Sequence, residues 1–284
     1  MSGQAATRAQ QRSRDIRIDE AGIHTGLWGA FRLKSVFQPV YLRDRERLVP
    51  FAVEGRTLPY VDGAALSEQF RRAVLDEELP ALDRLDRALH VGNLETLDSP
   101  DLQLFVAFDV RRPHGPSVVA EEARSIEGRL RATEIDTNRM VWVLRGHSDV
   151  SEETLASYVN VVRSSGMGLA TEESAPVFTS PERLAIIKPD FVRVAVSRLA
   201  LLSAAAVLPL VRAMFAALRE RGARVLVSGI GQPPELSLAL DAGADCLQGV
   251  LLAAPGLAGT LFDLPPLDAD RLRSRVGKIV PLFG

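Results

Sequence analysis

The sequence has little of three things that would point to a particular class of protein: cysteine, net charge and long apolar runs. Cys246 is the single cysteine among 284 residues. No disulfide can therefore form within the chain, and the apolar run that Cys246 opens indicates a buried thiol in a reducing compartment. The net charge is only −2, from 34 basic and 36 acidic residues, so no global field would attract a nucleic-acid backbone. We expect no nucleic-acid polymer as a partner.

Apolar runs long enough for a bilayer are also missing. The most apolar window, residues 199–218, is interrupted by Arg212 and is too short to cross a membrane. The first residues are polar and rich in arginine without an apolar core, which favours neither a secretory signal nor an anchor. We expect no membrane span, a flexible arm over residues 1–30 and, by default, a cytoplasmic location.

Short β-branched runs alternate with longer amphipathic stretches, the pattern of parallel strands joined by crossover helices. Eight strands are expected, the number that a closed (β/α)8 barrel needs; they span residues 31–42, 49–56, 102–110, 140–145, 168–171, 191–196, 224–230 and 246–252. Helices are expected at residues 64–93, 117–131, 151–164, 199–221 and 234–242. The first two strands follow each other directly, so they form a hairpin. The sequence thus predicts an α/β, TIM-like barrel with one antiparallel strand.

This barrel is expected to occupy residues 31–262. The remaining tail, residues 263–284, combines a charged helical stretch with the apolar end 279–283. We expect the tail to dock onto the barrel or onto a partner.

Eight segments carry recognisable strand motifs in a fixed order. They are residues 37–40 (Phe-Gln-Pro-Val), 52–56 (Ala-Val-Glu-Gly-Arg), 104–108, 141–144, 166–173, 189–195, 227–231 and 247–252 (Leu-Gln-Gly-Val-Leu-Leu). By their order and spacing the chain resembles the EAL-domain family of bacterial cyclic di-GMP phosphodiesterases. The resemblance covers residues 33–255 and implies a barrel of the EAL type.

The resemblance also places the family's metal ligands and catalytic side chains on this sequence. The glutamate of the family's name falls on Ala52, and further positions fall on Ala107, Leu144, Arg193, Ala195 and Ser228. Glu54 shares the strand face of Ala52 but lies about 6–7 Å further along, too far to replace the ligand. Glu172 and Glu173 take the place of the family's Asp-Asp pair, with longer side chains.

Hydrolysis by this family is understood to need two divalent ions held by clustered carboxylates. The replacements therefore predict a degenerate, catalytically inactive domain that is not an enzyme, with no catalytic residue, no metal site and no cofactor. The leading hypothesis is a signalling or scaffold module that acts through a protein partner, with a homodimer also open.

A second hypothesis is a non-hydrolysing cyclic di-GMP receptor. Its candidate ligand-binding residues are Gln38, Arg56, Arg193 and Gln248, because arginines and amides can hold phosphates without a metal. The competing interpretation pairs the two arginines with Glu54 or Glu172 and treats the glutamines as satisfied groups at strand ends.

A third hypothesis is an unrelated barrel enzyme acting on a small phosphate ester, bound by Gly229, Gly231 and Gly249. These glycines are equally typical of turns. The scattered histidines His24, His90 and His114 have no zinc-ligand spacing and are expected at the surface or as capping groups.

Overall fold

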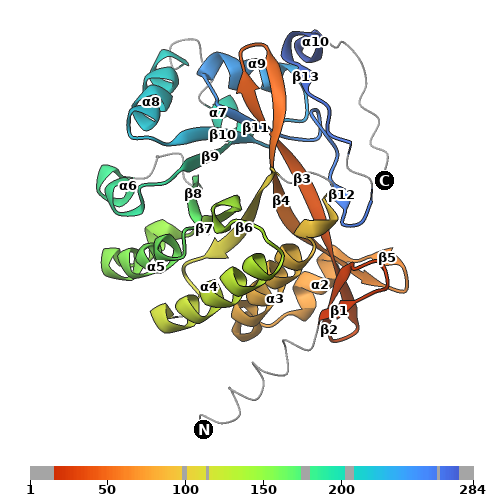
Figure 1. Cartoon of the computed structure of the whole chain (residues 1–284). Coiled ribbons are helices and arrows are strands. Elements are labelled where there is room, and N and C mark those ends of the chain that lie inside the picture. The colour runs from red at the N-terminus through yellow and green to blue at the C-terminus, as the bar shows by residue number, and fades with distance from the viewer. Residues whose placement is uncertain are drawn as a thin grey trace.

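The computed structural model describes residues 16–97, 101–112, 115–173, 180–201, 208–260 and 263–274. Eight of its strands close a barrel (Figure 1). In their order around the barrel they are β3 (Phe31–Asp44), β4 (Arg47–Val61), β6 (Gln103–Asp109), β7 (Met140–Arg145), β8 (Gly168–Glu173), β9 (Phe191–Ala195), β10 (Arg224–Ser228) and β11 (Cys246–Gln248). Strand β3 runs antiparallel to both of its neighbours, β4 and β11, and the other pairs are parallel. The predicted barrel with one antiparallel strand is confirmed.

The hairpin of β3 and β4 sets which side chains enter the barrel at its first edge. Val40 lies opposite Ala52, Gln38 opposite Glu54 and Val36 opposite Arg56. Because side chains on a strand alternate between its two faces, Ala52, Glu54 and Arg56 share one face of β4. Val53, between them, packs outside the barrel.

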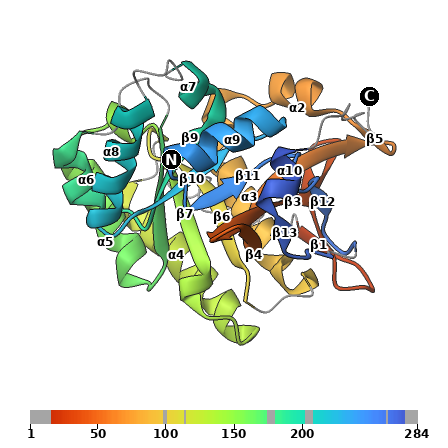
Figure 2. The ribbon, with the colours of Figure 1, turned by 90° about the horizontal axis from the view of Figure 1, so that it is seen from above.

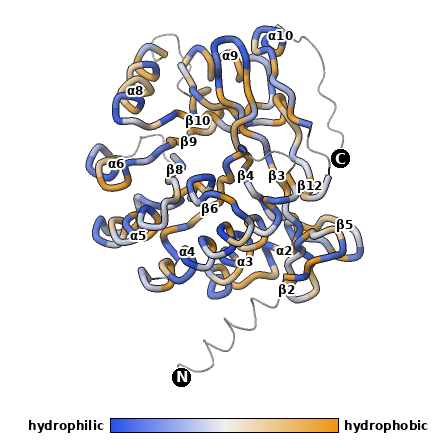
Figure 3. Tube along the Cα trace, in the orientation of Figure 1, coloured by the Kyte–Doolittle hydropathy of each residue, from blue (hydrophilic) through white to orange (hydrophobic). Residues whose placement is uncertain are grey.

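The same alternation divides the core into an inner and an outer part. The inner part is lined by small and apolar side chains, namely Val40, Ala52, Phe105, Val141, Val143, Ala170, Phe191, Leu226 and Cys246. The residues between them on the strands, such as Trp142 and Leu144 on β7, pack against the surrounding helices. The tube in Figure 3 shows hydrophobic residues along the strands and both hydrophobic and hydrophilic residues along the helices.

Helices surround the barrel, as the view from above in Figure 2 shows. They are α2 (Ser67–Ala73), α3 (Leu79–Gly92), α4 (Gly115–Ala132), α5 (Glu152–Ser164), α6 (Pro181–Ile187), α7 (Val196–Leu201), α8 (Leu208–Glu220) and α9 (Pro233–Ala242). In the described part of the chain, none of the helices has both the length and the apolar character that crossing a membrane requires.

Two predicted helices are divided differently. The helix expected at residues 64–93 breaks at Val74, which is extended with ψ 124°, and continues through the 3-10 turn Asp76–Glu78. Pro80 then lies in the first turn of α3, where its fixed φ and missing N–H are favourable. The helix expected at residues 199–221 corresponds to α7 and α8, and the residues between them lie outside the described ones.

The sheet extends beyond the barrel at both ends of the chain. Strands β1 (Ile16–Ile18) and β2 (His24–Trp28) pair antiparallel and continue onto β3, so part of the predicted arm is strand. Strand β5 (Ala64–Ala65) pairs with β4, and β12 (Gly256–Leu257) pairs with β3.

The described part of the tail, residues 263–274, packs onto the barrel. Strand β13 (Leu267–Asp268) pairs with β4, and α10 (Ala269–Arg273) contacts α9. The apolar end 279–283 lies outside the described residues, and the division of the chain into arm, barrel and tail stays a prediction.

We predict opposite effects for two glycine substitutions. A Cβ at Gly249, after β11, would lie 1.9 Å from the carbonyl oxygen of Ile230, whereas a Cβ at Gly128 in α4 would meet nothing within 4 Å. Gly249→Ala must therefore displace backbone and lower the free energy of unfolding by about 1–3 kcal/mol or more. Gly128→Ala should raise it by roughly 0.5–1 kcal/mol, since alanine loses less entropy in a helix. Urea denaturation of both variants checks this, and a neutral Gly249→Ala would contradict it.

Candidate functional site

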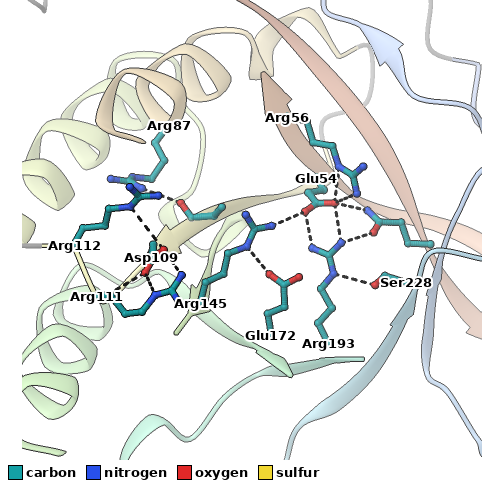
Figure 4. Close-up of polar contacts among 12 residues, drawn as sticks. Glu54, Arg56, Arg87, Asp109, Arg111, Arg112, Arg145, Glu172, Arg193 and Ser228 are labelled. Atoms are coloured by element: carbon teal, nitrogen blue, oxygen red, sulfur yellow. Dashed lines mark hydrogen bonds and ion pairs between the residues drawn. The ribbon is translucent and has the colours of Figure 1, made fainter. Parts of the chain in front are cut away.

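The carboxyl ends of the strands surround one buried carboxylate, that of Glu54 on β4 (Figure 4). Glu54 is 4% exposed. Arg193, on the opposite side of the barrel in β9, donates from Nη1 to Oε1 at 2.5 Å and from Nη2 to Oε2 at 3.2 Å. This two-pronged ion pair crosses the barrel mouth and joins residues 139 positions apart in the sequence.

Three further side chains complete the cluster. Arg56 donates to Glu54 Oε2 from Nη2 at 2.8 Å and from Nε at 3.1 Å. The amide of Gln248 donates to the same oxygen at 3.0 Å and accepts from Arg193 Nη2 at 3.1 Å. Ser228 Oγ accepts from Arg193 Nε at 3.2 Å. All three of these side chains are therefore bonded to Glu54 or to Arg193.

This arrangement fixes the charge of Glu54. Burial alone would raise the pKa of its carboxyl, because it disfavours the ionised form. The guanidinium groups of Arg193 and Arg56 outweigh that effect and hold the pKa at about 2. Glu54 is thus a carboxylate at any pH near neutrality. Burial lowers the pKa of Arg193, but the carboxylate of Glu54 outweighs this effect and raises the pKa, so Arg193 stays charged as well.

A second ion pair lies beside the first. Arg145, the last residue of β7, donates from Nε to Glu172 Oε2 at 2.5 Å, and its Nη2 lies 3.8 Å from Glu54 Oε1. Three guanidinium groups, those of Arg56, Arg145 and Arg193, therefore face the two carboxylates of Glu54 and Glu172. Within this cluster, guanidinium groups outnumber carboxylates.

Three of the four candidate ligand-binding residues converge. Arg56, Arg193 and Gln248 meet at Glu54, as the interpretation based on ion pairing predicted. Gln38 is buried on β3 opposite Glu54 in register, but its Nε2 donates to the carbonyl oxygen of Ala253 at 2.7 Å. Whether these residues bind a ligand stays a prediction.

Sequence reasoning missed Arg145. The motif comparison placed a ligand position at Leu144, but Leu144 packs outside the barrel with the helices. Counting by two from Val141 and Val143, which line the interior, identifies Arg145 as the inward residue at this strand end. Glu54 was considered both as a substitute metal ligand and as a partner of the two arginines, and its contacts in the structure are those with Arg56 and Arg193.

The carboxylates of the described strand ends do not fit a pair of divalent ions. Both oxygens of Glu54 and one oxygen of Glu172 are bound to guanidinium groups. The inward positions Ala52 and Ala107 offer no side-chain oxygen. Among the described residues, no group of three or more His, Cys, Asp or Glu side chains is arranged to hold a metal ion.

The glycines proposed as a phosphate site have structural roles. Gly229 has a φ of +83°, a conformation that favours glycine. The Cα of Gly249 lies so close to the backbone of Ile230 that no side chain would fit between them. The backbone N–H of Gly231 is bound to Glu235 Oε2 at 2.7 Å. These contacts explain the glycines without a ligand.

A pocket of 430 Å³ opens beside the ion pairs, between β4, the end of β7 and helices α2 and α3. Glu54, Arg56 and Arg145 form one wall of it, and residues of α3 form the other. Asp86 on α3 has a buried Oδ1 with no hydrogen-bond partner. Burial raises the pKa of this carboxyl to about 7, against the hydrogen bond from Thr57.

His90, one turn further along α3, is 3% exposed, so its expected place at the surface is wrong. Its Nδ1 shares a 2.9 Å hydrogen bond with Ser35 Oγ. Burial lowers its pKa to about 3, and the ring is neutral near pH 7. Gly55 on β4 leaves it the room it needs, since a Cβ there would lie 2.6 Å from the imidazole.

The buried ion pair gives a prediction for stability. Glu54→Gln leaves the guanidinium of Arg193 buried without a counter-ion, and we expect a loss of about 3–5 kcal/mol in the free energy of unfolding. Glu68→Gln is the matched control, because Glu68 and Arg72 form an exposed pair with side chains 67% and 77% accessible; its effect should stay below about 1 kcal/mol. Urea unfolding measures both.

The pH dependence follows from the lowered pKa. The stability that Glu54 contributes is complete above the ordinary pKa of 4.5 and is lost as the pH falls toward 2. Equal effects of Glu54→Gln and Glu68→Gln near neutral pH would contradict this account.

Asp86 gives a prediction of the opposite sign. Its folded pKa of about 7 lies above the ordinary 3.8, so its contribution is complete below pH 3.8 and is lost as the pH rises through 7. The free energy of unfolding of the protein, minus that of Asp86→Asn, should therefore fall over this range. His90 acts in both proteins and cancels in the difference. A difference that does not change between these pH values would refute the assignment.

A family model described as the EAL domain matches residues 29–255. The fold is similar to solved structures of EAL-domain proteins. The Bacillus subtilis YkuI protein, in complex with substrate c-di-GMP and calcium, is 18% identical with a TM-score of 0.68, over 85% of this chain and 60% of that one. Klebsiella pneumoniae BlrP1, in a manganese and cyclic di-GMP complex, is 16% identical with a TM-score of 0.67, over 83% and 59%.

A standalone EAL protein from Vibrio cholerae in its c-di-GMP-bound form is 15% identical with a TM-score of 0.65, over 80% of this chain and 93% of that one. The chain thus spans about three fifths of the length of YkuI and BlrP1. No curated protein matches the sequence significantly.

These findings correct one prediction from the sequence. The conclusion that the chain is not an enzyme conflicts with its family, in which YkuI holds cyclic di-GMP as a substrate. The missing carboxylates were too narrow a basis for that conclusion. The family also decides against an unrelated barrel enzyme. The chain belongs to the EAL-domain family.

Proposed function

We propose that this chain is a cyclic di-GMP signalling module that recognises the dinucleotide at the carboxyl ends of its barrel strands. The observation that carries the proposal is the cluster in which the guanidinium groups of Arg56, Arg145 and Arg193 face the carboxylates of Glu54 and Glu172. The excess positive charge suits a ligand with phosphodiester groups, since guanidinium–phosphate hydrogen bonds are charge-assisted. Structures of YkuI and of the Vibrio cholerae protein with c-di-GMP support this choice of ligand.

The two outer arginines are the ones that would meet the phosphates. The side chain of Arg56 is 52% exposed and that of Arg145 is 41% exposed, whereas that of Arg193 is 8% exposed. A guanidinium has five N–H donors, and Arg145 uses Nε for Glu172, so each outer arginine keeps donors for a ligand. Arg193 and Glu54 form the fixed base of this site.

The pocket beside the arginines offers a place for part of the ligand. Its volume of 430 Å³ lies within the range of ligand sites. Asp86 Oδ1 is a buried acceptor without a partner, and an unmet buried acceptor favours a ligand that brings an N–H donor. The purine bases of the dinucleotide carry such donors.

A protein partner is the natural receiver of the signal, as the sequence predicted. The loop that follows Gln248, the last residue of β11, carries Val250, a large apolar side chain that is 56% exposed. Val250 is the side chain that we assign to this contact. We include this protein contact, with a second copy of the chain as one form of it, in the proposed function.

Calorimetric titration with cyclic di-GMP tests the proposal. We expect saturable heat that is the same with and without magnesium. Arg56→Gln and Arg145→Gln should each weaken binding roughly ten- to a hundredfold, since a hydrogen bond to a charged group contributes about 1.5–3 kcal/mol. Arg124→Gln, an exposed arginine on α4, is the control and should bind normally.

Two results would sink the proposal: no saturable heat, or equal binding by all three variants. Chromatography of the titrated samples shows in addition whether the bound dinucleotide is linearised. Sedimentation of the same samples shows whether the ligand changes self-association.

A further inference from the structure

A second polar pocket lies at the opposite end of the barrel, where the parallel strands begin. Its volume is 390 Å³. Strands β6 to β10 contribute their first or second residue to its lining, namely Gln103, Val141, Gly168, Phe191 and Arg224. It shares no lining residue with the pocket beside Glu54. Ligands of the strand carboxyl ends would not reach it.

One pair of opposite charges in this pocket is already neutralised. Arg163, on α5, donates from Nη1 to Asp190 Oδ2 at 2.7 Å and from Nη2 to the carbonyl oxygen of Lys188 at 2.5 Å. The same Asp190 oxygen accepts from the backbone N–H of Leu169 at 2.8 Å. These bonds tie α5 to the starts of β8 and β9. The charges of Arg163 and Asp190 therefore cancel each other.

Arg224 is the charge that remains. It begins β10, and its guanidinium lies over the ring of Phe51 at 5.5 Å from the centroid. In the part of the chain that the structure describes, no ion pair or hydrogen bond involves this guanidinium. Phe51 in turn contacts Phe191, with ring centroids 5.7 Å apart. An aromatic floor thus holds the guanidinium while its N–H donors stay free, a geometry that cation–π attraction favours.

The walls add a polar group without a partner and room for close approach. Gln103 Oε1 is buried and has no hydrogen-bond partner, and its Nε2 reaches the carbonyl oxygen of Asn138 only at 3.4 Å. Glycines 166, 168 and 222 line the pocket as well. A Cβ at Gly222 would meet nothing within 4 Å, so this side of the pocket is open.

We propose that this pocket is a binding site for a small organic anion, one with a phosphate or carboxylate group and a hydroxyl. The anionic oxygens bind the free guanidinium of Arg224, because a charged donor without a counter-ion gains most from an anionic acceptor. The hydroxyl donates to Gln103 Oε1, which removes the cost of an unmet buried acceptor. The volume of 390 Å³ holds a molecule of this size.

The experiment uses the full chain and two probes, inorganic phosphate and glycerol 3-phosphate, at constant ionic strength against chloride. Amide chemical shifts of Gly166, Gly168 and Gly222 should change and saturate, with tighter binding for glycerol 3-phosphate because it supplies the hydroxyl. Arg224→Gln should weaken binding at least tenfold. Arg224→Lys keeps the charge and should retain part of the binding, and it serves as the folded comparison if Arg224→Gln is unstable.

Arg56→Gln is the matched control, since it removes a guanidinium at the other end of the barrel and should leave these shifts unchanged. The site is refuted if phosphate causes no saturable change, if only residues near Glu54 respond, or if Arg224→Gln binds as the unaltered protein does. Binding here does not depend on cyclic di-GMP, so this result stands apart from the calorimetric one.

Discussion

The contact between Glu54 and Arg193 is the constraint on which the rest of the barrel mouth depends. A carboxylate that is 4% exposed is costly unless a counter-ion and hydrogen bonds compensate for its lost hydration. Arg193 supplies both, from the strand directly across the barrel. Once this pair is fixed, Gln248 and Ser228 have defined partners, and Arg56 can reach Glu54 only from the outer side.

The apolar side chains beneath Glu54 leave the ion pair with Arg193 as its main compensation. Ala52, Phe105 and Phe191 fill the interior beneath Glu54 with apolar atoms and little accessible surface. Water cannot therefore replace a missing partner from below, and the low polarity strengthens the remaining charge contacts. The mouth is a polar layer on an apolar layer, and the exposed sides of Arg56 and Arg145 are where it meets solvent. This is why the proposed ligand contacts lie with those two arginines.

The sequence predicted the strands well, because β-branched runs with turns between them are local signals. The strand at residues 140–145 has the predicted bounds, and most others differ by one to three residues at an end. The helix at residues 64–93 failed at Val74, where the chain is extended. Pro80 was the available sign that a new helix begins there. Helix α6 was missed although Ser180 and Pro181 form an N-terminal cap that can be recognised in the sequence.

The site was harder to predict because it depends on which face each side chain takes. Motif order and spacing were enough to indicate the EAL family, but a ligand position was assigned to Leu144 without counting strand alternation from Val141. That choice hid Arg145. The pairing of Glu54 with Arg193 depends on the closure of the barrel, which brings β4 and β9 face to face, and no local pattern reports it. Nor does the loss of individual acidic residues establish what a family member does.

Helix α3 shows why polar residues at helical spacing can mislead. Asp83, Asp86, Arg87 and His90 lie at positions i, i+3, i+4 and i+7, the spacing of one helix face, and polar residues there are typical of a solvated face. In the structure this face lies against the barrel: Arg87 is 1% exposed, donates to the carbonyl oxygen of Ala107 at 2.8 Å and binds both oxygens of Glu122.

Its guanidinium also lies 5.3 Å from the centroids of the Phe108 and Trp142 rings. Polar contacts thus set the distance of α3 from β6, and that distance sets the width of the pocket beside Glu54. The helix that forms this wall is positioned by buried charge rather than by apolar packing alone. The buried charges of α3 and the ion pairs at the strand ends therefore line the same pocket from two sides.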